Sequence, residues 1–346
     1  MMSESAVPAT TSTDSATERA EAILARTRVL YEPALREAVA TLPEPLRAMG
    51  GYHFGWCDAE GAPVSARAGK ALRPALTVSA ATACGAPPRA AVAAAAAVEL
   101  VHNFTLLHDD VMDGDRNRRG RPAVWTVWSP ADAILLGDAL HALAVRTLVG
   151  GLSAAVAAAA VAEIELTVIE MCRGQHEDCR SGPGVRVDLG AYGRMAMAKT
   201  GSLMGCACAL GALCAGADAD TVAGMTAFGR DLGMAFQFVD DLMGIWGDPG
   251  VTGKPARDLA RRSMSLPVLA ALGSGTSAAS ELAAVYETGA AVDTERVARL
   301  VESAGGRRRA LLDAERHVRA AVDNLADPAR AADLITLAHL VSHRNR

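Results

Sequence analysis

The sequence predicts an all-α protein, and two observations support this fold class. Hydrophobic residues make up 51% of the 346 residues but aromatic residues only 4%, so Ala, Val and Leu must supply most of the apolar surface, a composition that favours helices over strands. No stretch alternates apolar and polar residues for long enough to build a sheet. Two irregular polar stretches, 115–130 and 247–265, interrupt the helical pattern and are expected to be functional loops.

The first third of the chain divides into a tail and three helices. Residues 1–16 are rich in Ser, Thr, Ala and Pro and are expected to form a disordered tail before a domain that spans 17–346. An amphipathic helix is expected over about 17–39 and, after a Pro- and Gly-rich stretch, a second over about 70–84. Residues 89–108 are apolar on more than one face, which is typical of a central bundle helix.

The rest of the chain continues this pattern, with Gly, Pro or Asp between the segments. Further helices are expected at about 130–149, 153–174, 188–215, 218–245, 265–272, 278–288, 293–304, 306–325 and 328–343. The longest apolar run, roughly 148–162, is too short to span a bilayer. We therefore expect no stable membrane insertion.

Charge and cysteine content narrow the function classes further. The 34 basic and 39 acidic residues give a net charge of −5, which disfavours a nucleic-acid partner. The seven cysteines are odd in number and include no C-x-x-C pair, as expected of free thiols in a reducing compartment. The N-terminus has neither the basic nor the apolar region of a secretory signal. A soluble, cytoplasmic protein is expected.

Three aspartates follow the apolar segment 89–108. Asp109 and Asp113 are four residues apart and share one helical face, so that together with Asp110 they could hold hard cations. Carboxylates beside an apolar helix are costly unless something neutralises them. The alternative is a solvated helix end, because DDxxD is a short string.

A second acidic pair, Asp240 and Asp241, ends another apolar helix. Carboxylates at a helix C-terminus oppose the helix dipole, which favours an accompanying cation. Each acidic group is followed by a loop that contains Lys, Arg and Gly. The two groups together predict a chamber in which Mg²⁺ bridges carboxylates to a diphosphate.

Several basic residues suit the same diphosphate. Lys70 and Arg73 are three residues apart, on one face of a predicted helix start. Lys199 and Lys254 each stand beside small residues that let a phosphate approach. The set is Lys70, Arg73, Arg118, Arg119, Lys199 and Lys254. Any one of them could be a solvated charge, but their combination with two acidic groups favours a diphosphate site.

Five motifs resemble, in order and spacing, those of the trans-isoprenyl diphosphate synthases, or polyprenyl synthetases. They are GKALRP, VELVHNFTLLHDDVMDGDRNRRGRPAVW, GDAL, KTG and GMAFQFVDDLMGIWGDPGVTGKP. The resemblance covers about residue 18 to the C-terminus and is closest to the geranylgeranyl diphosphate synthases. It implies a single domain of antiparallel helices around a central cavity (the isoprenoid synthase fold), a homodimer, and Mg²⁺ as cofactor, three ions per active site.

The resemblance also implies a role for each matching residue. The expected metal ligands are Asp109, Asp110, Asp113 and Asp240, and the expected catalytic set adds Asp241 and Lys199. Contacts to the allylic diphosphate are implied for Arg118, Lys199, Thr200, Gln237 and Lys254. Isopentenyl diphosphate is expected at Lys70, Arg73, His102 and Arg119, and Gln175 matches a cavity glutamine.

The implied reaction condenses isopentenyl diphosphate with dimethylallyl, geranyl or farnesyl diphosphate to an all-trans prenyl diphosphate. The departing diphosphate is stabilised by Mg²⁺ and cationic side chains, and the isopentenyl double bond attacks an allylic carbocation in a water-poor pocket. The proton is lost to the departing diphosphate. His108 is expected to pack or to bond a carboxylate and not to act as a base.

Product length is expected to depend on residues just before the first motif. Phe104, five residues before Asp109, would form a floor, and Thr105 would leave space beside it. This pattern, with no insertion between Asp110 and Asp113, resembles members that form the C20 product. A farnesyl or longer product remains the alternative, as does a Phe104 that only packs the core.

The chain departs from the family pattern at three places. Gly244 stands where many members have a third Asp, with Asp248 four residues on as partial compensation, and Ala71 replaces a frequent Arg. Ser263 and Met264 replace a common basic pair, although Arg261 and Arg262 lie nearby. We expect weaker metal binding with activity retained.

Two other function classes are compatible with these motifs. A terpene cyclase would ionise an allylic diphosphate without an acceptor, but it has no use for Lys70, Arg73 and His102. A non-catalytic subunit would be expected to lack the first aspartate motif, which is complete here.

Overall fold

The computed structural model describes residues 10–64, 69–180, 187–247, 258–287 and 293–343. The all-α prediction is confirmed: within these ranges, the strands are confined to one antiparallel hairpin, β1 (Asn117–Arg118) with β2 (Arg121–Pro122). The first part of the chain forms α1 (Thr10–Ala40), α2 (Leu46–His53), α3 (Leu72–Ala83), η1 (Pro88–Ala91) and α4 (Val92–Met112). The middle part forms α5 (Val124–Val127), α6 (Pro130–Gly151), α7 (Ala154–Cys179), α8 (Leu189–Ala196), η2 (Met197–Gly201) and α9 (Ser202–Cys214). The last part forms α10 (Ala219–Trp246), α12 (Leu266–Leu272), α13 (Ser277–Glu287), α14 (Thr294–Ser303), α15 (Gly306–Asp323) and α16 (Ala332–His343).

The described helices differ from the sequence-based expectation in one boundary, two additional short helices and one interrupted helix. Helix α1 begins at Thr10, so residues 10–16, expected in the tail, are helical. Helices α2 and α5 form inside stretches that were expected to be irregular. The segment expected as one helix over 188–215 is α8 and α9 joined by the π-helical turn η2.

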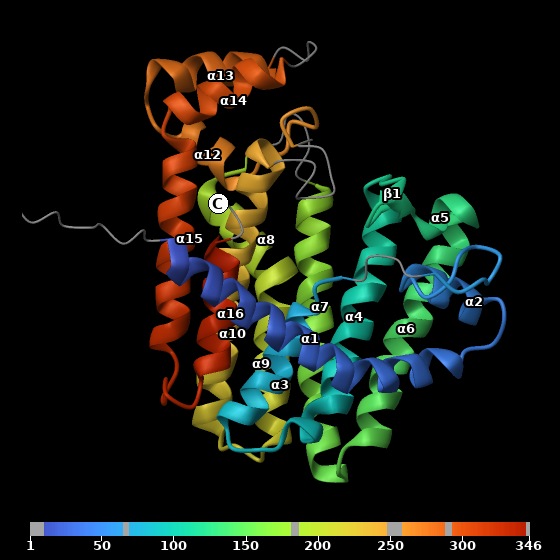
Figure 1. The fold of residues 1–346 in the computed structure, drawn as a ribbon. Helices are drawn as coiled ribbons and strands as arrows, with labels where there is room; N and C mark the ends of the chain where they lie inside the picture. Colours follow the sequence, from blue (N-terminus) through green and yellow to red (C-terminus); the bar gives the residue numbers. More distant parts are fainter. Residues whose placement is uncertain (1–9, 65–68, 181–186, 248–257, 288–292, 344–346) are drawn as a thin grey trace, which may run out of the picture.

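The long helices form a bundle. Figure 1 shows α4, α6, α7 and α10 running in roughly the same direction, with α1 crossing in front of them and α13 and α14 at one end. Helix α4 packs on α6, α1 and α3, and α10 packs on α9 and α15. The hairpin that follows α4 lies at the upper end of the bundle in Figure 1, and this end carries the acidic residues.

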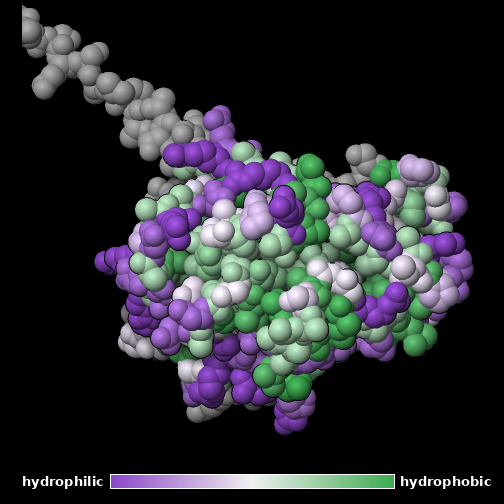
Figure 2. Space-filling model, turned by 90° about the horizontal axis from the view of Figure 1, so that it is seen from below, coloured by the Kyte–Doolittle hydropathy of each residue, from purple (hydrophilic) through white to green (hydrophobic). Residues whose placement is uncertain are grey.

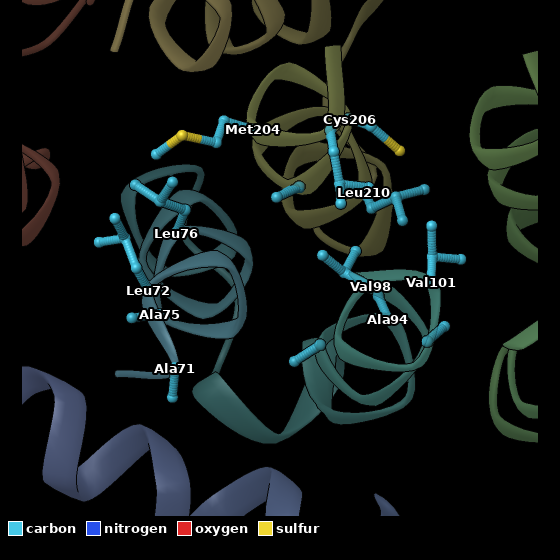
Figure 3. Close-up of a cluster of buried hydrophobic side chains, with 14 of the residues drawn as sticks. Ala71, Leu72, Ala75, Leu76, Ala94, Val98, Val101, Met204, Cys206 and Leu210 are labelled. Carbon is cyan, nitrogen blue, oxygen red and sulfur yellow. The ribbon is translucent and has the colours of Figure 1, made fainter. Parts of the chain in front are cut away.

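Small side chains let the central helices approach closely. Ala94, Val98 and Val101 of α4 face Leu76 of α3 and Leu210 of α9 in a shared core (Figure 3). At Gly211 a Cβ atom would lie 2.2 Å from the carbonyl oxygen of Thr77, so only glycine allows α9 this close to α3. The Ala-rich composition is therefore what permits tight helix packing.

Among the described residues, three helical segments are long and apolar enough to cross a membrane by length and composition: Pro88–Met112, Pro130–Gly151 and Leu189–Cys214. The first and third are mostly covered by the rest of the chain, at 67% and 78% of the apolar window, whereas α6 is covered over only 39%. Apolar side chains also reach the surface: the face in Figure 2 is green over much of its centre, with hydrophilic residues towards the rim. Part of the apolar surface thus remains open on the single chain.

Candidate active site

The first aspartate motif lies where α4 ends. Asp113 is the C-cap of α4, and Lys199 stands opposite, donating a hydrogen bond to Asp178 of α7 at 2.7 Å. Burial raises the pKa of Asp109 to about 6, although the nearby Lys199 charge lowers it. Burial also raises the pKa of Asp113. Asp109 is partly buried, so further positive charge beside it is favoured, whereas Asp113 is exposed at the end of the helix.

The middle aspartate of this motif has a different environment. The Asp110 side chain is 2% exposed and accepts a hydrogen bond from Arg118 Nε at 2.9 Å, with a second from Arg118 Nη2. Arg118 lies on β1, so this ion pair fastens the hairpin to α4. Asp110 is thereby held by a protein cation, while Asp109 and Asp113 lie nearer Lys199.

The second motif also contains one accessible and one buried aspartate. Asp240 is exposed, whereas Asp241 is buried and accepts hydrogen bonds from Tyr192 Oη (2.5 Å), Gln237 Nε2 (2.9 Å) and the Leu266 backbone N–H (2.7 Å). Burial raises the pKa of Asp241 to about 7 against the effect of these three donors. Asp241 thus joins α8, α10 and α12, and Asp240 is the member of the pair that is open to a ligand.

A local helix irregularity places Lys199 and Thr200. Both lie in the π-helical turn η2, a feature that is frequent at functional sites. Gly174 of α7 packs directly beneath, where a Cβ atom would lie 2.6 Å from the Lys199 backbone nitrogen. Thr200 Oγ1 donates to Gln237 Oε1 at 2.7 Å. Gln237 donates in turn to Asp241, so Thr200 and Gln237 are joined to the second motif. Lys199 is held by Asp178.

Two of the residues predicted to bind isopentenyl diphosphate, Arg73 and Arg119, lie close to two partly buried histidines, His102 and His53. Arg73 Nη1 lies 3.4 Å from His102 Nε2, and Arg119 Nη2 donates to Asn103 Oδ1 at 3.4 Å. Burial, helped by the Arg73 charge, places the pKa of His102 well below its usual value. Burial, helped by Arg119, lowers the pKa of His53 to about 3. Neutral imidazoles among guanidinium groups form an anion-binding environment.

The predicted helical pairing of Lys70 with Arg73 is wrong. Helix α3 begins at Leu72, after Ala71 in the left-handed conformation (φ 56°), so Lys70 precedes the helix and is exposed. The two basic groups are not on one helical face. Arg73 remains beside His102 on the first turn of α3.

Two pockets border this basic group, and Arg119 lines both. One is also lined by Tyr52, His53, Arg118 and Arg121. The other is also lined by Arg28, Tyr31, Gly69 and Glu99. Arg119 therefore separates two concave spaces at the end of α4.

The remaining predicted residues have mixed outcomes. Lys254 and Asp248 lie outside the described residues. Gln175 donates to the sulfur atoms of Met112 and Cys179, and its Oε1 atom is buried without a hydrogen-bond partner. His108 packs over Gly137 and contacts the Ile134 carbonyl at 3.0 Å, as expected of a packing histidine.

Phe104, which is predicted to set the product length, is buried on α4. Its side chain is buried at 8% exposure, one to two turns of α4 before Asp109. Its ring packs against His108 and His141, with ring centroids 5.5 and 5.3 Å away. His141 is held in turn by Glu165 of α7 at 2.8 Å. Thr105 bonds the His102 carbonyl and fills little space.

The acidic residues suit Mg²⁺. Asp109, Asp113 and Asp240 offer only hard oxygen ligands. Across the parts of the chain that are described, no three His, Cys, Asp or Glu side chains are close enough to hold a metal ion by themselves. This is compatible with Mg²⁺, which keeps several waters and binds through one or two carboxylates plus substrate phosphates.

Four residues of this region were not singled out from the sequence. Asp178, Tyr192 and His53 contact Lys199, Asp241 and Asn103, respectively, from other helices. Asp258 lies against Gly244. For Asp178 a signal existed, since it follows Gln175 by three residues in GQHED; for the other three the contacts are long-range and no local pattern marks them.

Comparison with known proteins identifies the family. The polyprenyl synthetase family model matches residues 57–304. The chain belongs to the polyprenyl synthetase family. Geranylgeranyl diphosphate synthase of Mycobacterium tuberculosis is 51% identical over 328 residues, 94% of both chains. The (2E,6E)-farnesyl diphosphate synthase of the same organism is 44% identical over 349 residues, covering 98% of this chain and 97% of the relative.

A solved structure agrees with this membership. The polyprenyl synthetase from Streptomyces coelicolor A3(2) superposes with a TM-score of 0.88 at 41% identity, covering 92% of this chain and 98% of that one. The predicted family and the all-α isoprenoid synthase fold are confirmed. Like its family, this polyprenyl synthetase is a prenyltransferase.

Proposed function

We propose that this prenyltransferase condenses isopentenyl diphosphate with an allylic diphosphate and releases geranylgeranyl diphosphate, the C20 product. The observation that carries the chain length is the position of Phe104: its buried ring, closed off by His108 and His141, lies on the helix that ends in Asp109. A growing chain that runs from Asp109 along α4 meets this ring. The 51% identity to a geranylgeranyl diphosphate synthase supports the same product.

The family is Mg²⁺-dependent, and we assign three Mg²⁺ ions to Asp109, Asp113 and Asp240, with Asp110 at the edge of the site. Bound Mg²⁺ supplies positive charge to the diphosphate oxygens as the allylic C–O bond breaks. Lys199, from η2, adds a protein cation that is already oriented by Asp178. Because the charges of Asp109 and Asp178 outweigh the effect of burial, the pKa of Lys199 is raised and it stays protonated.

The two diphosphates use different sides of the chamber. Lys199, Thr200 and Gln237, together with Arg118 and Lys254, are assigned to the allylic diphosphate. Arg73, His102 and Arg119, with Lys70 at the rim, are assigned to isopentenyl diphosphate. The apolar wall of α4 excludes water between them, so the allylic cation is attacked by the isopentenyl double bond. The departing diphosphate accepts the proton, because the lowered pKa values of His102 and His53 make them weak bases.

We propose that the enzyme is a homodimer joined through α6 and α7. Leu135 and Val149 of α6 and Leu166 and Ile169 of α7 are 57–67% exposed, an unusual number of large apolar side chains on neighbouring helices. Asp138 of α6 is also exposed, at 66% of its side chain. A charged residue beside this surface suits a protein partner better than a bilayer.

We also propose a cytoplasmic location without membrane insertion. All seven cysteines fall within the described residues and are free thiols, as is usual in a reducing compartment. The two most apolar stretches besides α6 are covered by other helices of the chain.

Gel filtration with light scattering would test the dimer, and a monomer at micromolar concentration would contradict it.

The product is tested by incubating the purified protein with Mg²⁺, isopentenyl diphosphate and each allylic starter in turn. Released diphosphate and the chain length of the dephosphorylated products are measured. A C20 alcohol is expected, whereas C15 or longer chains would keep the reaction and overturn the Phe104 floor. Diphosphate release with a cyclic hydrocarbon and without elongation would indicate a cyclase.

A further inference from the structure

We infer that Asp258 supplies the carboxylate that the second aspartate motif lacks at position 244. In the sequence, Gly244 is the last residue of DDLMG, four residues after Asp240. A glycine inside an α-helix costs about 1 kcal/mol relative to alanine, so its presence in α10 calls for a reason. The inference rests on the proposed Mg²⁺-dependent reaction and concerns which side chains of this chain serve it.

The reason lies in the space beside Gly244. A Cβ atom built there would lie 2.0 Å from Asp258 Oδ2 and 2.6 Å from its Cγ. The Asp258 backbone N–H also approaches the Gly244 carbonyl oxygen at 3.4 Å. The carboxylate of Asp258 therefore occupies the volume that a side chain at position 244 would fill.

This placement puts the Asp258 carboxylate on the face of α10 that carries Asp240. Residues i and i+4 of a helix are neighbours, with Cβ atoms roughly 6 Å apart. Asp240 and the carboxylate lodged at Gly244 are therefore one turn apart on the same face of α10. Two carboxylates at this spacing are what a DDxxD motif presents, although here the second comes from outside the helix.

A neighbouring arginine connects the segment that begins at Asp258 with the residues that follow the first motif. Arg261, three residues on, forms an ion pair with Asp115, which follows the first motif. The pKa of Arg261 is raised mainly by its hydrogen bond to Asp115, and also by the charges of Asp113 and Asp258. Asp258 is thus within the field of a side chain that reaches across to the other acidic group.

The second aspartate motif is therefore rearranged: Asp258 replaces the missing carboxylate, and metal binding by the motif is not weakened. Restoring the family residue by Gly244→Asp would bring two carboxylates into one volume, and it should impair metal binding unless Asp258 is removed at the same time. This expectation is the reverse of what the sequence motif alone predicts.

The test measures Mn²⁺ binding by electron paramagnetic resonance, in the full-length protein with inorganic pyrophosphate present. Asp258→Ala and Gly244→Asp should each weaken Mn²⁺ binding about 10-fold or more. The double variant Gly244→Asp with Asp258→Ala should recover to within about 3-fold of wild type. Asp220→Asn, an exposed acid at the start of α10, is the matched control and should bind as wild type does.

Asp258→Asn keeps the shape of the side chain and separates charge from packing. It should weaken Mn²⁺ binding while leaving the melting temperature close to that of wild type. The inference is overturned if Asp258→Asn binds Mn²⁺ normally, or if the double variant binds no better than Asp258→Ala. Failure of the wild-type protein to bind Mn²⁺ with pyrophosphate would overturn the proposed metal-dependent reaction as well, so the two failures are distinguishable.

Discussion

The two acidic helix ends of this enzyme each carry one buried and one more accessible aspartate, but different side chains hold the buried one. In each Asp-Asp pair, the second residue is buried and held by the protein: Asp110 by Arg118, and Asp241 by Tyr192, Gln237 and the Leu266 backbone. The first residue of each pair is less enclosed: Asp109 is partly buried and Asp240 is exposed. Neighbouring aspartates on a helix point about 100° apart, so one of each pair is enclosed by the fold while the other stays more accessible to a ligand.

The difference between the two ends is how they are completed. The first motif is completed by its own Asp113 and faces Lys199 of η2. The second has Gly244 at the corresponding position, and Asp258 fills the space. The first end is therefore encoded in a short stretch of sequence, whereas the second depends on the contact of Asp258 with Gly244 of α10.

The largest effect is expected at the chamber-facing aspartate of the first motif. Asp109→Ala should lower kcat by about 1,000-fold, because transition-state charge would lose part of its stabilisation. The melting temperature without metal should not fall, since a poorly solvated carboxylate is removed. Steady-state kinetics and calorimetry check this, and Asp220→Asn should leave both unchanged. A fall in melting temperature with normal kcat would reverse the roles assigned to the pair.

The buried aspartates should behave in the opposite way. Asp110→Ala leaves Arg118 buried without its main partner, and Asp241→Ala leaves three donors unpaired, so each should lower the free energy of unfolding by about 3 kcal/mol. Urea unfolding in the absence of metal measures this. Asp240→Ala is the matched exposed control, with an expected change below about 0.5 kcal/mol. Equal destabilisation by Asp240→Ala and Asp241→Ala would break the comparison.

The pH dependence of stability sharpens the same contrast. Burial raises the pKa of Asp241 from 3.8 to about 7, so the folded state binds a proton that the unfolded state has released. The stability that this group contributes is present at about pH 4 and is lost as the pH rises to about 7. The unfolding free energy of wild type minus that of Asp241→Asn should therefore fall across this range. The lowered pKa values of His53 and His102 act in the other direction but cancel in the difference.

Urea titrations of both proteins in EDTA, from pH 4.5 to 8, would provide that difference. A difference that grows with pH would show that the pKa of Asp241 is lowered in the folded state. A flat difference would mean that the group does not titrate in this range.

A smaller, qualitative change is expected at the chamber floor. Phe104→Ala should lengthen the main product by at least one isoprene unit, because the ring that faces His108 and His141 is removed. Phe104→Leu keeps much of the volume and should shift the distribution less. Chromatography of dephosphorylated products measures both. An unchanged distribution in Phe104→Ala would mean that Phe104 only packs the core.

The smallest effect is expected for the contact between the two motifs. Arg261→Gln removes the ion pair with Asp115, but the Arg261 side chain is 45% exposed and the pair should contribute about 1 kcal/mol or less. The KM for the allylic diphosphate should rise less than about 5-fold. A loss of activity similar to that of Asp109→Ala would show that Arg261 replaces the basic pair absent at Ser263 and Met264.

Much of the fold could be predicted from the sequence, because apolar periodicity and helix-breaking residues act locally. The long apolar segments appear as α4, α6, α7 and α10 with small boundary changes. The short helices α2 and α5 were missed, since both lie in stretches where Pro, Gly and polar residues obscure any pattern. The π-helical turn at Lys199 was also missed, because it depends on how α7 packs beneath it at Gly174.

For the site, too, local features could be predicted from the sequence and long-range contacts could not. Sequence alone determined which helix ends carry acids and which segments carry arginine and lysine, since motif spacing is a local property. Tertiary structure decided which aspartate of each pair is enclosed, that Lys70 leaves the helix before Arg73, and that Asp258 fills the place beside Gly244. These outcomes depend on burial and on contacts between residues far apart in the chain, and no window of sequence contains both partners.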